Sequence, residues 1–209
     1  MDKKFPKQIP IFPLSGVIYF PRTNLPLNVF EERYLDLVND SFRGDKLMGM
    51  VQSKKENSLV YKVGCLGKIS DYQETSDGRV LINLTGITRF EITKEISSKK
   101  KYREFEVDYK KFYKDLLVPN KIEVEYDKSN FLEKVKKYFK KNGLTINWKE
   151  FEKLDETQKI NTLSMIAPIS NEEKQKLLET VSLGDKANTL LNIIDFYSYE
   201  NSFDKETIQ

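Results

Sequence analysis

The sequence predicts an α+β protein in which a β-rich part comes first and a helical part follows. Short apolar segments separated by glycine and proline fill residues 1–118, which is typical of compact sheets and barrels. After Pro119 the apolar residues recur with a helical period. An apolar fraction of 39%, with 13 Phe and 11 Tyr, is typical of a folded chain. We therefore expect two domains, residues 1–118 and 119–209.

The β-rich part contains six segments with strand character, at 9–13, 17–20, 46–52, 59–73, 78–93 and 103–112. Proline cannot donate to a ladder, so the proline-flanked segments 9–13 and 17–20 are predicted to be edge strands or strand ends. Gly64 and Gly67 mark a bulge or a close backbone approach. Gly86 predicts a bend, and Asp77-Gly78 a turn.

One helix is predicted inside this β-rich part. Residues 25–38, LPLNVFEERYLDLV, place the adjacent carboxylates Glu31 and Glu32 before Arg33. Neighbouring helical side chains point about 100° apart, so the two carboxylates cannot face each other as an acid/base pair. We expect a structural helix start near residue 30, with Arg33 in a local ion pair. The predicted core-facing stripe consists of Phe30, Tyr34, Leu37, Val38 and Phe42.

The helical part begins with a helix that Ser129 is expected to cap and that ends near Gly143. Its predicted apolar face is Leu132, Val135, Tyr138 and Phe139. Residues 155–158 (DETQ) and 170–173 (SNEE) have the spacing of capping boxes. A last helix is predicted from about Asp185.

Composition excludes several kinds of site. The chain has no histidine and one cysteine, Cys65, so a Cys/His zinc site and a histidine-dependent catalytic unit are excluded. We expect no metal and no cofactor, and a buried, inert Cys65. No segment approaches the roughly 20 apolar residues of a membrane helix, and the N-terminus lacks the apolar run of a signal peptide. We expect a cytoplasmic protein with no membrane partner.

Three weaker chemical motifs remain. Residues 64–70, GCLGKIS, have the wrong spacing for a phosphate-binding P-loop. Residues 97–103, SSKKKYR, could contact phosphate, although a charged hairpin tip is the favoured interpretation. Ser164 and Ser170 near Lys174 raise the alternative of a Ser-Lys hydrolase, although Ser170 is better explained as a helix cap.

The order of the motifs resembles a known family. Residues 9–34, 63–69, 77–79, 84–92 and 168–179 together resemble the Lon protease N-terminal (substrate-binding) domain. The resemblance implies a PUA-like β pseudo-barrel with one helix, followed by a helical bundle. No Walker A motif or Ser-Lys peptidase segment follows, so we expect the stand-alone bacterial form that lacks the ATPase and peptidase modules. Arg22 departs from the family, in which glycine commonly follows this proline.

The resemblance favours a non-enzymatic polypeptide-binding module that recognises substrates or acts as an adaptor. Its expected partner is an unfolded or tagged polypeptide, together with a protease or chaperone. The polypeptide could add to an edge strand at 9–13 or 17–20, or enter a groove between the two parts. An RNA-binding PUA-like module is the alternative, although 29 lysines against 6 arginines do not favour a nucleic-acid partner. A hydrolase or peptidase is the third hypothesis. The expected contact residues are Tyr19, Phe20, Arg22, Glu31, Glu32 and Arg33.

Overall fold

The structure is a computed structural model that describes residues 5–54, 59–117 and 125–206, with side chains through residue 199. The chain divides into two compact units, residues 1–117 and 118–209, and each unit is described by itself. The expected domain boundary at residues 118 and 119 lies outside the described residues.

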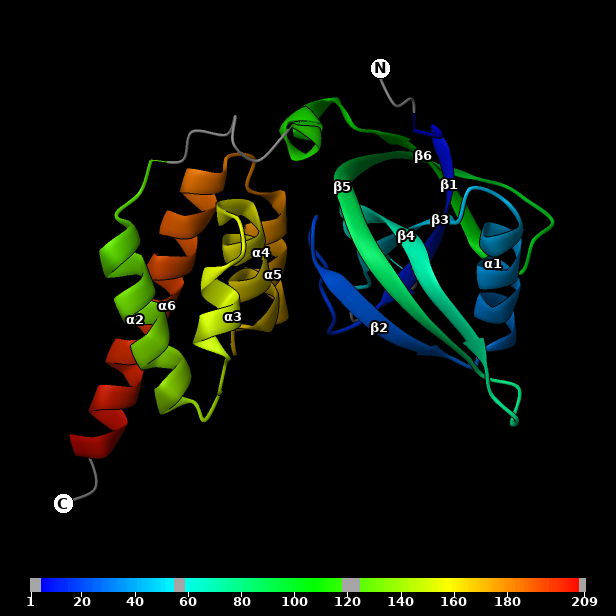
Figure 1. Ribbon diagram of the computed structural model, residues 1–209. Coiled ribbons are helices and arrows are strands. Elements are labelled where there is room, and N and C mark those ends of the chain that lie inside the picture. Colours follow the sequence, from blue (N-terminus) through cyan, green and yellow to red (C-terminus); the bar gives the residue numbers. More distant parts are fainter. Residues whose placement is uncertain (1–4, 55–58, 118–124, 207–209) are drawn as a thin grey trace. The chain divides into compact units, whose positions relative to one another are not determined.

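The first unit is a six-stranded mixed sheet with one α-helix (Figure 1). The predicted curled sheet with a single helix is confirmed, although the strand at residues 24–29 was not among the predicted segments. Its strands are β1 (Gln8–Leu14), β2 (Asn24–Val29), β3 (Leu47–Gln52), β4 (Val63–Glu74), β5 (Val80–Ile96) and β6 (Arg103–Asp108). The helix α1 (Glu32–Arg43) follows β2, and a 3₁₀ helix (Lys110–Leu116) follows β6. The strand order is β2-β5-β4-β3-β1-β6, and a further β5–β6 pairing curls the sheet into a ring.

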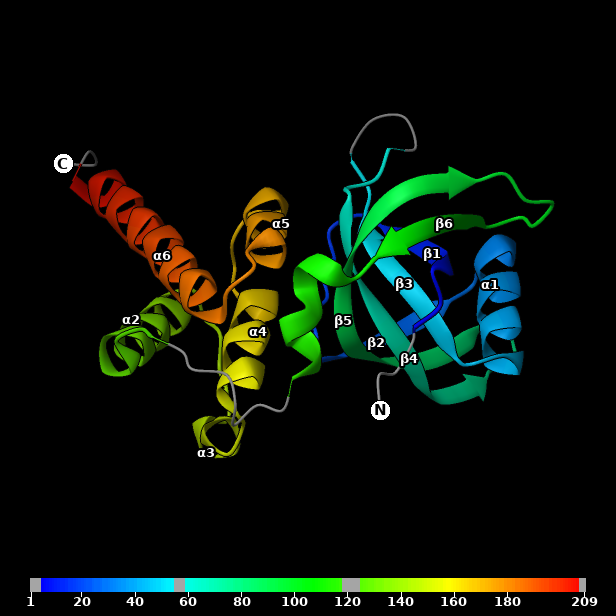
Figure 2. The ribbon, with the colours of Figure 1, turned by 90° about the horizontal axis from the view of Figure 1, so that it is seen from above.

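The long strand β5 closes this ring because its two halves pair with different strands. Residues 80–85 pair with β2, and residues 91–96 pair with β6. Gly86 lies between the two halves, where the sequence predicts a bend. A ring of this kind leaves few unpaired strand edges, and β2 pairs with β5 alone within the described sheet. Figure 2 shows β5 and β6 curving over the other strands.

The prediction that residues 9–13 form an edge strand is wrong. β1 pairs with β6 through its first half and runs parallel to β3 through its second half. Pro10 has a register partner only in β6 and Pro13 only in β3, so each proline lies where β1 is paired on one side. The second expected edge strand, residues 17–20, is not a strand in the structure.

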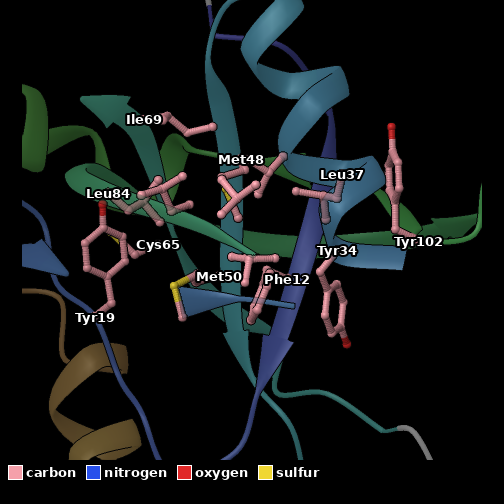
Figure 3. Packing of buried hydrophobic residues seen from close by; sticks show 14 residues of the cluster. Phe12, Tyr19, Tyr34, Leu37, Met48, Met50, Cys65, Ile69, Leu84 and Tyr102 are labelled. Atoms are coloured by element: carbon pink, nitrogen blue, oxygen red, sulfur yellow. The ribbon is translucent and has the colours of Figure 1, made fainter. Parts of the chain in front are cut away.

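The structure confirms that the central residues of the apolar stripe predicted for α1 are buried, but the residues at the two ends of the stripe are exposed. Tyr34, Leu37 and Val38 are buried in the core, and the Tyr34 ring lies 4.3 Å from that of Phe12 (Figure 3). Phe30 and Phe42 are 63% and 37% exposed. Phe30 precedes the first helical residue, so helical periodicity does not determine its direction.

The second unit consists of helices α2 (Lys128–Lys141), α3 (Trp148–Glu152), α4 (Glu156–Ile166), α5 (Asn171–Glu179) and α6 (Leu183–Glu206). Both predicted capping boxes are present: Asp155 and Gln158 cap α4, and Ser170 and Glu173 cap α5. The cap predicted for α2 is wrong, because Asp127 rather than Ser129 accepts the backbone N–H of the first turn.

Candidate functional site

A groove of about 990 Å³ lies on the first unit and is called here the bulge groove. Three short segments that are far apart in sequence form most of its wall: residues 44–46 after α1, residues 68–70 of β4 and residues 85–87 of β5. Arg22 lies on the β5 side, and Phe5, Asp115 and Leu116 complete the lining. A concave surface with apolar and polar groups together is the usual form of a binding site.

Two β-bulges, one in β5 and one in β4, lie at this groove with three residue pairs of the β4–β5 ladder between them. Ile87 has no partner in the β4–β5 register, because Gly67 pairs with Gly86 while Leu66 pairs with Thr88. Ser70 likewise falls between the paired residues Ile69 and Asp71. A bulge bends its strand and redirects the side chain of the extra residue. The half-buried Ile87 and the exposed Ser70 therefore both reach the groove wall.

The loop before β2 supports the groove from below. The carbonyl oxygen of Phe20 lies where a side chain on Gly86 would begin, and the Tyr19 hydroxyl occupies the same place at Gly67. The loop is then tied to β5 by two backbone hydrogen bonds, from Arg22 N–H to Gly86 O at 3.0 Å and from Gly86 N–H to Thr23 O at 2.9 Å. Only glycine admits so close a backbone approach. The glycines of β4 and β5 thus fix the groove floor.

Burial perturbs the tyrosine beneath this floor. The Tyr19 side chain is 2% exposed, and its buried hydroxyl has no hydrogen-bond partner among the described residues. Its ring lies beside Cys65 (Figure 3), the buried cysteine predicted from the sequence. Burial raises the pKa of Tyr19 far above its usual value, and Cys65 adds to the effect. Tyr19 is therefore a neutral core residue rather than an acid or base of the groove.

The charges on the groove wall are mostly positive. Arg22, Lys46 and Lys68 line it as cations, and Asp45 lies on the rim beside them. The other acidic lining residue, Asp115, is 9% exposed and accepts hydrogen bonds from the buried guanidinium of Arg89, at 2.7 and 2.9 Å. The hydroxyl groups of the wall are close together, because Thr85 Oγ1 lies 3.3 Å from Ser70 Oγ. Thr85 Oγ1 also donates to Asn24 Oδ1 at 2.9 Å.

A second hollow, of about 420 Å³, lies beside the start of α1 and is called here the α1 pocket. Three of its four lining cations are bound to carboxylates, and Lys54 is the fourth. Arg33 bonds Glu31 at 2.7 Å, and Arg103 bonds Glu95 at 2.7 Å. Lys101 bonds Glu32. The bulge groove is the stronger candidate site, because its volume is more than twice that of the α1 pocket.

The six sequence-predicted contact residues do not form one surface. Tyr19 and Phe20 are buried beneath the bulge groove, and Arg22 lies in its wall. Glu31 and Arg33 line the α1 pocket as the ion pair that the sequence predicts. Glu32 is exposed in the first turn of α1, where its hydrogen bond from Lys101 lowers the pKa of the carboxyl.

Sequence reasoning missed Lys46, Ser70, Thr85 and Ile87. The available signal was the set of strand glycines, because Gly67 and Gly86 mark the positions at which another chain segment approaches the sheet. Among the described residues, no group of three or more His, Cys, Asp or Glu side chains could hold a metal ion. None of the described helices is both long and apolar enough to span a membrane.

Solved structures with the same fold define the class of protein. The Lon N-terminal domain protein from Xanthomonas campestris is 22% identical with a TM-score of 0.65, and covers 88% of this chain and 97% of that chain. The N-terminal domain of a Mycobacterium avium complex Lon protease is 16% identical with a TM-score of 0.61, and covers 90% and 98% of the two chains. The first unit's ring and the second unit's helices thus recur in Lon N-terminal domains.

The family follows from the sequence comparison. The family model of the ATP-dependent protease La (LON) substrate-binding domain matches residues 8–195 of this sequence. The chain therefore belongs to this family. The Lon protease of Cytophaga hutchinsonii is 27% identical over 209 residues, and that of Syntrophus aciditrophicus is 24% identical over 206 residues. These matches cover 93% and 92% of this chain but 25% of each relative. The chain therefore spans about a quarter of the length of these proteases.

Proposed function

We propose that the first unit binds unfolded polypeptide in the bulge groove and acts by recognition rather than by catalysis. The observation that carries this proposal is the pair of bulges in β4 and β5, since the apolar Ile87 and the hydroxyls of Ser70 and Thr85 line the same groove. An extended polypeptide presents apolar side chains together with peptide groups, so a wall that offers both kinds of contact suits it.

Family membership supports the same conclusion. The family is named for substrate binding, and the relatives are proteases, whose substrates are polypeptides. A groove of about 990 Å³ has room for several residues of an extended chain, since ligand pockets of about 300–1,000 Å³ bury most of a drug-sized molecule. An adaptor role further requires a protease or chaperone that receives the bound polypeptide.

The residues considered for hydrolysis have structural roles. Ser164 is fully buried and donates to the Ile160 carbonyl at 2.8 Å. Ser170 accepts the Glu173 backbone N–H at 3.2 Å and caps α5. Burial lowers the pKa of Lys174, but both hydroxyls are already used by helix backbone. These contacts favour recognition over peptidase chemistry.

The basic loop at 97–103 does not favour RNA. Lys100 bonds Glu104 at 3.1 Å, and Lys101 bonds Glu32 on α1. The Tyr102 hydroxyl donates to Asp40 at 2.7 Å. Cations that already pair with carboxylates gain less from a phosphate than unpaired cations would.

The experiment compares two variants in which one apolar residue of β5 is replaced by serine. Ile87→Ser removes the apolar wall of the bulge groove, and Leu81→Ser is the matched control, because Leu81 is 39% exposed on β5 outside the groove. Anisotropy of a fluorescently labelled, permanently unfolded protein should show binding to wild type and Leu81→Ser. We expect Ile87→Ser to bind about fivefold more weakly, as expected for roughly 1 kcal/mol of lost apolar contact.

Two results would contradict the proposal. The first is equal affinity of Ile87→Ser and wild type. The second is no association of the unfolded protein with wild type up to high micromolar concentration. Circular dichroism of both variants excludes global unfolding as the cause of a change in affinity.

A further inference from the structure

One strand of the ring has a free edge. Within the described sheet, β2 pairs with β5 alone, whereas each of the other strands pairs with at least two neighbours. The β2–β5 register runs from the Asn24–Thr85 pair to the Val29–Val80 pair. The side of β2 that faces away from β5 therefore has no strand partner in the part of the sheet that the structure describes. A free edge presents unpaired N–H and C=O groups to other chains.

Two observations determine which backbone groups point away from β5. The Gly86 N–H donates to the carbonyl of Thr23, the residue before β2, at 2.9 Å, so this carbonyl points toward β5. Backbone direction alternates along an antiparallel strand, so every second residue from 24 onward points away from β5. Pro26 agrees with this assignment, because a residue without an N–H fits a strand where no ladder bond is needed. The free edge therefore offers an N–H and a carbonyl at Asn24 and at Asn28, and a carbonyl alone at Pro26.

The side chains of β2 indicate which sequence suits this edge. Asn24, Pro26 and Asn28 are exposed, whereas Leu25 and Leu27 are half-buried and pack against the core. In a strand added to the edge, each side chain lies on the same face as the β2 residue opposite to it. Residues that pair with the exposed positions therefore face solvent. The residues between them extend the apolar face at Leu25 and Leu27.

We propose that the free edge of β2 binds an extended polypeptide segment, which adds to the sheet as an antiparallel strand. The segment carries apolar residues at its second and fourth positions and polar residues at its first, third and fifth positions. The polar residues pair in turn with Asn28, Pro26 and Asn24, and the apolar residues cover the two leucines. Main-chain hydrogen bonds supply the affinity, and the apolar pair supplies the specificity. This inference goes beyond the proposed function, because none of these β2 residues lines the bulge groove.

Pro26 makes a second copy of the chain a poor occupant of the edge. Two β2 strands that pair with each other each lack an N–H at residue 26, so donors are missing on both sides of the ladder. A segment without proline lacks only the one bond that Pro26 itself cannot donate. Natural sheets use proline at exposed edges against self-pairing. The edge therefore favours a segment of another polypeptide.

The experiment uses a labelled peptide with the core Thr-Val-Thr-Val-Thr, flanked by lysines for solubility. In the proposed complex the N–H groups of the threonines point toward β2, and those of the valines point away. N-methylation of the central threonine should weaken binding to the wild type about fivefold in fluorescence anisotropy, because it removes one hydrogen-bond donor. N-methylation of either valine should leave the affinity unchanged within about twofold. This alternation is the signature of a β ladder.

Three variants change the edge itself. Asn28→Pro removes an outward N–H and no bond to β5, so it should bind the unmethylated peptide about fivefold more weakly. Asn28→Thr is the matched control, because it keeps the N–H, and it should bind as the wild type does. Pro26→Thr supplies the missing N–H and should bind about fivefold more tightly. Circular dichroism verifies that each variant is folded, and misfolding does not produce a gain in affinity.

Each other outcome overturns the inference. Equal effects of methylation at threonine and at valine exclude a β ladder, and so does unchanged binding to Asn28→Pro. Ile87→Ser should bind this peptide as the wild type does; weaker binding assigns the peptide to the bulge groove, and the proposed function then stands without the inference. Self-association in sedimentation velocity that Pro26→Thr strengthens, without peptide binding, assigns the edge to a second copy. No binding of the peptide to the wild type overturns the inference and leaves the proposed function to its own test.

Discussion

The Phe20 carbonyl oxygen lies so close to the Cα of Gly86 that a side chain on Gly86 would begin less than 3.0 Å from it. This contact joins the loop before β2 to the middle of β5. The hydrogen bond from Arg22 N–H to Gly86 O, at 3.0 Å, lies directly beside it. The position of Arg22 in the bulge groove therefore depends on a glycine that is 64 residues further along the chain (86 − 22).

The first prediction concerns this contact. Gly86→Ala places a Cβ against backbone atoms, which cannot rotate away, so we expect it to lower the free energy of unfolding by about 2–4 kcal/mol. Gly44→Ala is the control, since the nearest atoms there are 3.7 Å away and φ is −98°. Urea denaturation followed by circular dichroism measures both variants. Equal stability of Gly86→Ala and wild type would show that the loop does not support β5 in this way.

The second prediction concerns the left-handed backbone of Lys46. Lys46→Ala keeps the strained φ of 61°, whereas Lys46→Gly relieves it. The glycine variant should therefore be more stable than the alanine variant by about 1 kcal/mol, although glycine makes the unfolded chain more flexible. Thermal unfolding of the two variants under identical conditions gives the comparison. A more stable alanine variant would exclude a left-handed conformation at this residue.

The third prediction concerns the buried Tyr19 hydroxyl. Because this hydroxyl has no hydrogen-bond partner in the described part of the chain, Tyr19→Phe should leave the free energy of unfolding unchanged or raise it by about 1 kcal/mol. Tyr102→Phe is the opposite case, since its hydroxyl donates to Asp40 at 2.7 Å, and it should lower stability by about 1 kcal/mol. Urea denaturation at pH 7 separates the two cases. A loss in Tyr19→Phe as large as that in Tyr102→Phe would show that the Tyr19 hydroxyl is bonded in solution.

The fourth prediction follows from the titration of Tyr102. Burial is the main cause that raises its pKa from 10.0 to about 12; a hydrogen bond with Lys100 opposes the rise, and the bond to Asp40 adds to it. A raised folded-state pKa stabilises the fold fully below the unfolded value of 10.0, and this contribution is lost as the pH rises through about 12. Between pH 10 and pH 12, the free energy of unfolding of the wild type should therefore fall relative to that of Tyr102→Phe. A difference that stays constant across this range would contradict the assignment.

Local signals in the sequence were sufficient for much of the fold. The capping boxes at Asp155 and Ser170 were predicted because each depends on residues within one helical turn. The Glu31–Arg33 ion pair at the start of α1 is local for the same reason. The Asp77-Gly78 turn also needs only its own residues, and Gly78 has a φ of 81° there.

The errors arise where distant segments decide the outcome. The prolines of β1 suggested an edge strand, because the sequence does not show that β1 changes partner along its length. Most of the bulge groove was missed for a similar reason. Ser70 and Ile87 become bulge residues through the β4–β5 register, and no local pattern in either strand specifies that register.

Residue-resolved mapping of a bound polypeptide tests the central claim most directly. An amide correlation spectrum of the isotope-labelled chain should be recorded during titration with a permanently unfolded, unlabelled protein. If the bulge groove is the binding site, the largest shift changes will fall on residues 44–46, 68–70 and 85–87, the segments that form its wall. Changes centred on the α1 pocket or on the second unit, or no changes at saturating polypeptide, would contradict the proposed function.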